Sequence, residues 1–451
     1  MIKNWPYLLS GFCALMLTHQ SCIAANDSSD VEVEAKTEIE IETNVETTPE
    51  PKQAIAPRDN TKNKSSRLNI SAEDKKTIQY YEELIRELES SGGVYQNQLA
   101  EVLSSLGTTY QSLGLHVDAV EVFQRSLHIV RVNGGLYGLN QLPVLEKLIE
   151  SNTELKDWEA LNKNHHNLYW VSKRHYGDNN PALLSLIDRI GRWHLKAYEL
   201  EPGSQSFSHL VNAEQMYNKS VGIIQLHSGA HDLRLINALY GIALTNFQIA
   251  AQVSSAENFD DIRAGYRDAT QTRRLLQEQR ARQDLIMQSY AKGKQAMMNI
   301  VDIHANNPIL PIETQAMAMT HLGDWYLLFN KRNSAAETYE SAYQLMQNDG
   351  MAQEKIDNLF GRPRTLPAIR LPVQNEKEML PENPPYVLAS FDVSPSGKAQ
   401  NIEILESRPI DNISHLRRAK RSIAGTKFRP RYVDGKPVVT TGVNLRYVFT
   451  D

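Results

Sequence analysis

The residues that could perform chemistry in this 451-residue chain are few and widely spaced. His227 and His231 are four residues apart, a spacing that could place two metal ligands on one face of a helix, and Asp232 follows them. Gly229 lies between the two histidines, however, and the surrounding LHSGAHD is typical of a loop. His165 and His166 precede an apolar stretch, where a helix would bury one ring and expose the other. We therefore expect no metal site at either pair.

Cysteine chemistry depends on the fate of the N-terminus, because Cys13 and Cys22 both lie within residues 1–25. The sequence has no Gly-rich phosphate-binding loop and no nucleophile elbow. Once the first 25 residues are removed, the chain has no thiol for a disulfide, a zinc site or a catalytic nucleophile. We predict a protein that is not an enzyme and that requires no cofactor.

Residues 1–25 are organised like a secretory signal peptide, with Lys3, an apolar run and small residues at the end. The apolar run covers about eleven residues, whereas a membrane-spanning helix needs about twenty. We expect cleavage after Ala24 or Ala25 and a periplasmic location. An uncleaved inner-membrane anchor is an alternative, and so is lipid attachment at Cys22, although His19, Gln20 and Ser21 do not match a lipobox.

Charge is strongly segregated along the chain, although the net charge of the whole is only -5. Residues 26–50 contain nine acids and one base, so we predict a disordered acidic tether over residues 26–66. The alternation in VEVE and EIEIE leaves open a strand that forms when a partner binds. The chain as a whole is not basic, so its composition does not indicate nucleic-acid binding.

A basic stretch near the C-terminus has the opposite sign, with nine bases between Arg408 and Lys436 against Asp411 and Asp434. It could attract the acidic tether or form a solvated helix face. The candidate basic patch comprises Arg417, Arg418, Lys420, Arg421, Lys427, Arg429 and Arg431.

Residues 67–360 have helical periodicity almost throughout. Within residues 100–133, small and aromatic residues follow the pattern Leu106, Gly107, Tyr110, Ala119, Phe123. Residues 316–349 repeat it as Leu322, Gly323, Tyr326, Ala335, Tyr339. Both segments resemble the 34-residue tetratricopeptide repeat, in which small residues let two antiparallel helices approach and aromatics fill the space between hairpins. We predict an irregular solenoid of about five hairpins, with Gly107 against Ala119 and Gly323 against Ala335.

The resemblance implies a ligand-binding groove lined by four positions of the first helix of each repeat. In the first unit these positions are Glu101, Ser104, Thr108 and Gln111, and in the last they are Met317, Thr320, Asp324 and Leu327. They include no lysine or arginine that would bind a C-terminal carboxylate, so the ligand of the groove stays open.

After the helices, six prolines between Pro363 and Pro385 predict a linker over residues 361–383. Residues 384–451 then change to a period of two, with YVLASFDV and AQNIEIL forming a hairpin around SPSG. A helix capped by Asn412 and a last alternating strand, VVTTGVNLRYVF, complete a β-β-α-β unit. The predicted fold class is mainly α, a helical solenoid followed by a small α+β domain.

This C-terminal module resembles the C-terminal domain of TonB energy transducers. The resemblance rests on Phe391, Val393 and Gly397 of the first hairpin, on Phe428-Arg429-Pro430 and on Gly435 to Val438. It implies that the last strand accepts an extended peptide from an outer-membrane receptor by β-augmentation. The alternating residues that would select the peptide are Val439, Thr441, Val443, Leu445 and Tyr447, and Val443→Pro would remove a backbone donor.

The chain also departs from that family, because the transducers keep an N-terminal membrane helix with a histidine, and here the apolar run is short and His19 follows it. We expect a periplasmic protein that couples other proteins, with receptor binding in TonB-dependent transport as its role. A soluble scaffold for envelope assembly, without energy transduction, is the alternative.

Overall fold

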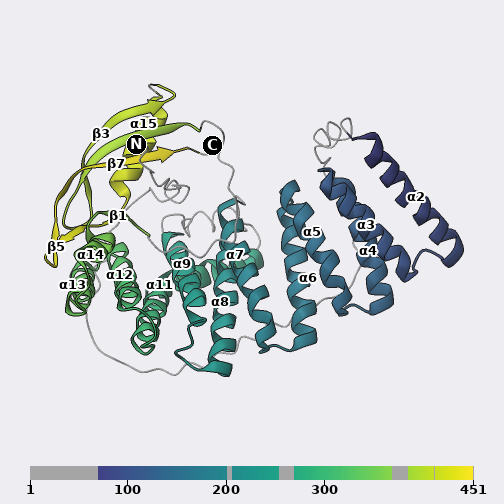
Figure 1. Ribbon diagram of the computed structural model, residues 1–451, viewed down its shortest axis with the longest axis horizontal. Coiled ribbons are helices and arrows are strands. Elements are labelled where there is room, and N and C mark those ends of the chain that lie inside the picture. Colours follow the sequence, from purple (N-terminus) through teal and green to yellow (C-terminus); the bar gives the residue numbers. More distant parts are fainter. Residues whose placement is uncertain (1–69, 201–205, 253–268, 368–383, 411, 450–451) are drawn as a thin grey trace. The chain divides into compact units, whose positions relative to one another are not determined.

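The computed structural model describes residues 70–200, 206–252, 269–367, 384–410 and 412–449. These residues fall into two compact units that divide between Val171 and Ser172. The predicted signal peptide, its cleavage site at Ala24 and Ala25, the acidic tether and residues 368–383 of the predicted linker all lie outside the described residues. The fold is mainly α, built from sequential helix pairs with a small α+β region at the C-terminus (Figure 1). Among the described helices, none is long and apolar enough to cross a membrane.

The first unit contains α2 (Ala72–Gly92), α3 (Asn97–Ser112), α4 (His116–Gly134), η1 (Leu139–Gln141), α5 (Leu142–Leu155) and most of α6 (Trp158–Tyr176). Ser71 caps α2 by accepting a hydrogen bond from the Asp74 amide. Helix α3 packs against α2 and α4 around fully buried Leu99 and Leu103. The predicted hairpin over residues 100–133 is therefore present as α3 and α4.

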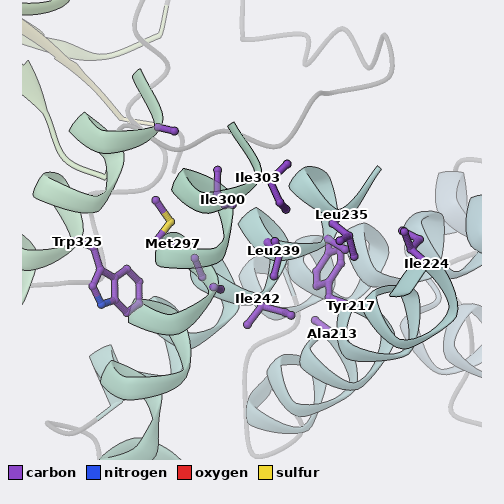
Figure 2. Packing of buried hydrophobic residues seen from close by; sticks show 14 residues of the cluster. Ala213, Tyr217, Ile224, Leu235, Leu239, Ile242, Met297, Ile300, Ile303 and Trp325 are labelled. Atoms are coloured by element: carbon purple, nitrogen blue, oxygen red, sulfur yellow. The ribbon is translucent and has the colours of Figure 1, made fainter. Parts of the chain in front are cut away.

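The second unit continues with η2 (Pro181–Leu183), α7 (Leu184–Leu200), α8 (Ser206–Ser228), α9 (Leu235–Ala251), α11 (Ala269–Ala305), α12 (Ile312–Leu328), α13 (Arg332–Asn348) and α14 (Gln353–Phe360). Each of α7 to α13 packs against its neighbours in sequence. Figure 2 shows the resulting core, where Tyr217 of α8, Leu239 of α9, Met297 of α11 and Trp325 of α12 lie along one continuous row. The second predicted hairpin, over residues 316–349, is present as α12 and α13.

Close helix contact depends on a glycine that faces an aromatic ring of the neighbouring helix. A Cβ on Gly107 would lie 2.5 Å from the Phe123 ring, and one on Gly323 would lie 2.6 Å from Tyr339. Trp325 packs on Gly293 in the same manner. In both hairpins the missing Cβ makes room for the aromatic side chain of the following helix, while the contacts of Gly107 with Ala119 and of Gly323 with Ala335 stay a prediction.

The glycines that follow each helix pair recur at a longer spacing than the 34 residues of the repeat pattern in the sequence. Gly93, Gly135 and Gly177 all have positive φ after a helix end, and they are 42 residues apart. Gly229 occupies the equivalent place 52 residues after Gly177, because α7 and α8 have 17 and 23 residues where α5 and α6 have 14 and 19, and because five residues rather than two separate the two helices. Positive φ suits glycine, so these four residues mark the ends of helices with one conformation.

The C-terminal module is built on a three-stranded antiparallel sheet of order β3-β2-β7. Its strands are β2 (Tyr386–Val393), β3 (Ala399–Arg408) and β7 (Thr440–Val448), and α15 (Ile413–Gly425) covers one face. The predicted β-β-α-β order is confirmed. Between α15 and β7 the chain also forms β4 (Phe428–Arg429) and a short hairpin of β5 (Arg431–Val433) and β6 (Lys436–Val438).

The module begins earlier than the predicted boundary. The neighbouring prolines placed Arg364 and Thr365 in the predicted linker, but these two residues form β1 and pair with β4. Leu366 is buried in the same cluster as Tyr339, Phe360 and Tyr432. The predicted linker is therefore wrong for residues 364–366, because β1 and the buried Leu366 fix this stretch against the module.

Candidate functional site

Strand β7 forms an edge of the C-terminal sheet. It pairs with β2 in antiparallel register, from Tyr386 opposite Val448 to Val393 opposite Thr440. Among the described residues no strand pairs with its other side. An edge strand of nine residues offers alternate backbone N–H and C=O groups to another extended chain.

The hydrogen bonds next to the strand determine which residues point outward. The Phe449 amide donates to the Pro385 carbonyl oxygen over 2.8 Å, so the backbone of Phe449 faces β2. Because strand residues alternate, Val443 and Leu445 also direct their N–H groups toward β2. Asn444 and Arg446 therefore direct theirs to the free edge. A proline at Val443 would break the native pairing and not the free edge, which corrects the test suggested by the sequence.

A β-bulge interrupts the alternation of β7. Thr441 and Gly442 together lie opposite Asp392, because the register jumps between the Phe391–Val443 pair and the Val393–Thr440 pair. Gly442 has a φ of 67°, and its amide donates to Asp392 Oδ1 over 3.1 Å. The predicted row of Val439, Thr441, Val443, Leu445 and Tyr447 is thus not a single face.

The two faces of β7 differ in character. Val443, Leu445 and Tyr447 face α15, where Tyr447 is fully buried and the other two are half-buried against the core. Val439 and Thr441, before or within the bulge, are exposed. The opposite face carries Asn444 and Arg446, both exposed, and the Arg446 guanidinium lies 3.8 Å from the centre of the Tyr386 ring. Tyr386 in turn donates its hydroxyl to Glu406 of β3, which raises the pKa of that tyrosine.

The basic stretch separates into an exposed set and a buried set. Arg417, Arg418, Lys420 and Arg421 are exposed on α15, and Arg431 is exposed on β5. Arg429 is only 1% exposed, and Lys427 is half-buried. The prediction of one basic patch is wrong for the last two, because both point into the helical part of their own unit.

Arg429 forms a buried ion pair with Asp324 of α12. The Arg429 Nε donates to Asp324 Oδ1 over 2.8 Å, and a second guanidinium nitrogen donates to Oδ2. The Tyr339 hydroxyl donates to the same Oδ1 over 2.7 Å. Burial opposes the charge of the guanidinium, but the adjacent carboxylate outweighs it and raises the pKa of Arg429. This bidentate contact fixes β4 against the last helix pair.

Lys427 makes the second polar contact between the module and α12. Its Nζ donates to the carbonyl oxygens of Leu327 and Leu328 and to Asn330 Oδ1, at 3.2, 2.6 and 2.7 Å. A cation is favourable at the carbonyl end of a helix. Burial, with Arg332 and Lys398 nearby, lowers the pKa of Lys427 to about 8.

The proposed groove positions of the last repeat are therefore mostly closed. Thr320, Asp324 and Leu327 are buried, Asp324 by its pairing with Arg429, and only Met317 stays exposed. In the first repeat Glu101 and Thr108 are exposed and Ser104 is half-buried. Gln111 donates to the Lys147 carbonyl and to Ser151 Oγ, which joins α3 to α5. A groove on α12 is wrong, and one on α3 stays a prediction.

His227 and His231 have separate partners. His227 Nε2 lies 2.8 Å from the Asn179 carbonyl oxygen, whereas His231 Nε2 lies 2.9 Å from Asp302 Oδ2. Within the described part of the chain, no three metal-binding side chains gather.

Sequence reasoning missed the buried pair because its partners are 105 positions apart. One signal was present: Asp324 is the single acid in an apolar helical run, residues 316–329, which contains no Glu, Lys or Arg. An unpaired carboxylate would not be buried in such a run, so the acid indicated a cationic partner elsewhere in the chain.

Comparison with known proteins assigns no family and no function to this chain. No protein-family model matches the chain, and no curated protein matches it. Among solved structures, BtubC (BKLC) from P. vanneervenii matches 70% of this chain and 100% of its own, with 10% sequence identity and a TM-score of 0.30. A likeness at this level supports no conclusion about function.

Proposed function

We propose that this protein binds an extended segment of another protein by β-augmentation at the free edge of β7. The observation that carries the proposal is the one-sided pairing of β7, with the backbone of Asn444 and Arg446 directed away from β2. Side chains next to these positions would select the bound sequence. The activity is protein binding and not catalysis.

The resemblance of the module to TonB C-terminal domains suggests the partner. We propose the periplasmic N-terminal segment of an outer-membrane receptor in TonB-dependent transport, with the exposed face of α3 at Glu101 and Thr108 as a contact for a second protein. The location is the periplasm, reached by a cleaved signal peptide.

A scaffold in envelope assembly is the second candidate. The buried Arg429–Asp324 pair and the Lys427 contacts attach the sheet to α12, so that peptide bound at β7 would be held rigidly by the helical part of this unit. Such attachment suits a scaffold that positions two proteins without transmitting force.

Titration of the full chain with synthetic receptor segments tests the proposed site. We expect binding that is lost in Asn444→Pro, because proline removes an N–H directed to the free edge. Asn444→Ala, which removes the same side chain but keeps the backbone N–H, is the matched control and should bind normally. Equal binding by both variants and the unmodified chain would exclude augmentation at β7.

A further inference from the structure

The two edges of the C-terminal sheet carry opposite charge on its open face. Strand β3 places two acids, Glu403 and Glu406, opposite Ser390 and Leu388 of β2, and one base, Arg408, at its end opposite Tyr386. Strand β7, TTGVNLRYV, contains no acid, and its single charged residue is Arg446, opposite Leu388. A peptide added beside β7 would therefore meet a positive charge on this face and would be separated from the two glutamates by β2.

Arg446 can form an ion pair with a carboxylate of an added strand. Its guanidinium carbon lies 3.8 Å from the centre of the Tyr386 ring, and this contact holds the side chain on the open face. Within residues 384–410 and 412–449, no carboxylate forms an ion pair with it. A carboxylate on a neighbouring strand would be a favourable cross-strand partner, by about 0.2 to 1 kcal/mol in an exposed sheet.

The other face of β7, toward α15, favours apolar side chains on an added strand. Helix α15 packs mainly against β3 and β2, and Val443 and Leu445 at the edge are left half-buried. Apolar side chains on an added strand would cover these two residues and extend the core beside α15. Because side chains of a strand alternate, one strand can satisfy both faces only with a period of two.

We propose that the segment bound at β7 alternates apolar and acidic residues, with its apolar side chains against Val443 and Leu445 and a carboxylate beside Arg446. This inference rests on the proposed function, since it names the chemistry of the peptide that the edge accepts. Charge complementarity decides the occupant: a basic or uncharged strand lacks the ion pair, and an acidic strand on the β3 edge would meet Glu403 and Glu406, which outnumber the single base Arg408.

Fluorescence anisotropy with three labelled peptides tests the proposal. The acidic probe is TEIEIET, a sequence that occurs at residues 37–43 of this chain, and its controls are TQIQIQT and TKIKIKT. The full chain should bind TEIEIET at least threefold more tightly than TQIQIQT and should bind TKIKIKT least. The preference should shrink as salt is added, because screening acts on exposed charges.

Reversing the charge at Arg446 tests whether this residue causes the preference for the acidic peptide. Arg446→Glu should invert the order, so that TKIKIKT binds best, whereas Glu403→Gln on β3 and Arg421→Gln on α15 should leave the order unchanged. All three side chains are exposed, so the variants should fold. An acidic preference that survives Arg446→Glu, or that disappears in Arg421→Gln, would overturn the proposal and assign the attraction to the helix.

The outcomes separate this inference from the proposed function. Equal binding of all three peptides, lost in Asn444→Pro, would retain augmentation and reject the acidic preference. Binding that Asn444→Pro leaves intact would reject both. If Asn444→Pro does not fold, slower hydrogen exchange at the Asn444 and Arg446 amides on addition of TEIEIET replaces it, and unchanged exchange contradicts augmentation.

Discussion

Arg429 and Asp324 carry their charges where water does not reach, since each side chain is 1% exposed. Removing both ions from water costs several kcal/mol, and the bidentate geometry with the Tyr339 hydroxyl offsets that cost. The pair therefore contributes mainly by specifying where β4 docks, and either partner alone would be strongly unfavourable.

Arg429→Ala should lower the free energy of unfolding of this unit by about 3 to 5 kcal/mol, because it leaves the Asp324 carboxylate buried without a partner. The double variant Asp324→Leu with Arg429→Met should regain most of that loss, since apolar residues of similar volume need no counterion. Urea unfolding followed by tryptophan fluorescence, to which Trp325 of this unit contributes, measures both. A single variant as stable as the unmodified chain would contradict the buried pair.

His321, on α12 near the same pair, makes stability depend on pH. Burial lowers its pKa to about 4, below the value near 6.5 of an unfolded chain, and the neutral Nδ1 lies 2.8 Å from the Tyr240 hydroxyl. Between pH 6.5 and 4 the unfolded state binds more protons, so stability falls as the pH is lowered through this range. The loss amounts to about 3 kcal/mol at most.

Replacing His321 by Asn, which keeps an acceptor for Tyr240, should flatten this dependence. Thermal melting at intervals from pH 7 to pH 4 provides the comparison, with His227→Asn on an exposed site as control. The interpretation fails if His321→Asn and the unmodified chain lose the same stability over that range.

The helices illustrate what could be predicted from the sequence. Spacing of Gly107 with Phe123 and of Gly323 with Tyr339 predicted both hairpins, because helix pairing depends on residues close together in the chain. The docking of Arg429 on Asp324 could not be predicted in this way, since a contact across 105 positions leaves no local pattern. The prediction that Val439 to Tyr447 present one row of alternate side chains was also wrong, because the bulge at Gly442 shifts the alternation of β7 by one residue.

Packing of α12 on α13 provides a direct test of the glycine contact. Gly323→Ala should destabilise the protein by about 1 to 3 kcal/mol, because the new methyl group would lie 2.6 Å from the Tyr339 ring. Gly222→Ala in α8 is the matched control: its Cβ would meet no atom within 4 Å. There alanine should stabilise the helix by about 0.5 to 1 kcal/mol. Equal effects of the two substitutions in thermal melting would reject the close contact.

Within the second unit the sheet module and the last helices share one core. Tyr432 of β5 packs against Tyr339 of α13 and Phe360 of α14, with ring centres 5.5 and 5.6 Å apart. The core of the three-stranded sheet is separate and contains Phe391, Ile423 and Phe428. Loosening the first core should therefore affect helices and β5 together while the sheet persists.

Hydrogen exchange on the full chain can resolve this coupling. In Tyr432→Ala, amides of α12 to α14 and of residues 428–438 should lose protection together, since both sides lose one shared cluster. Strand β2 should exchange as before, because its core does not contain Tyr432. Phe123→Ala, in the first unit, is the control and should expose α3 and α4 alone. Loss of protection confined to residues 428–438 would mean that the module folds independently of the helices, and the rigid attachment that a scaffold requires would then be absent.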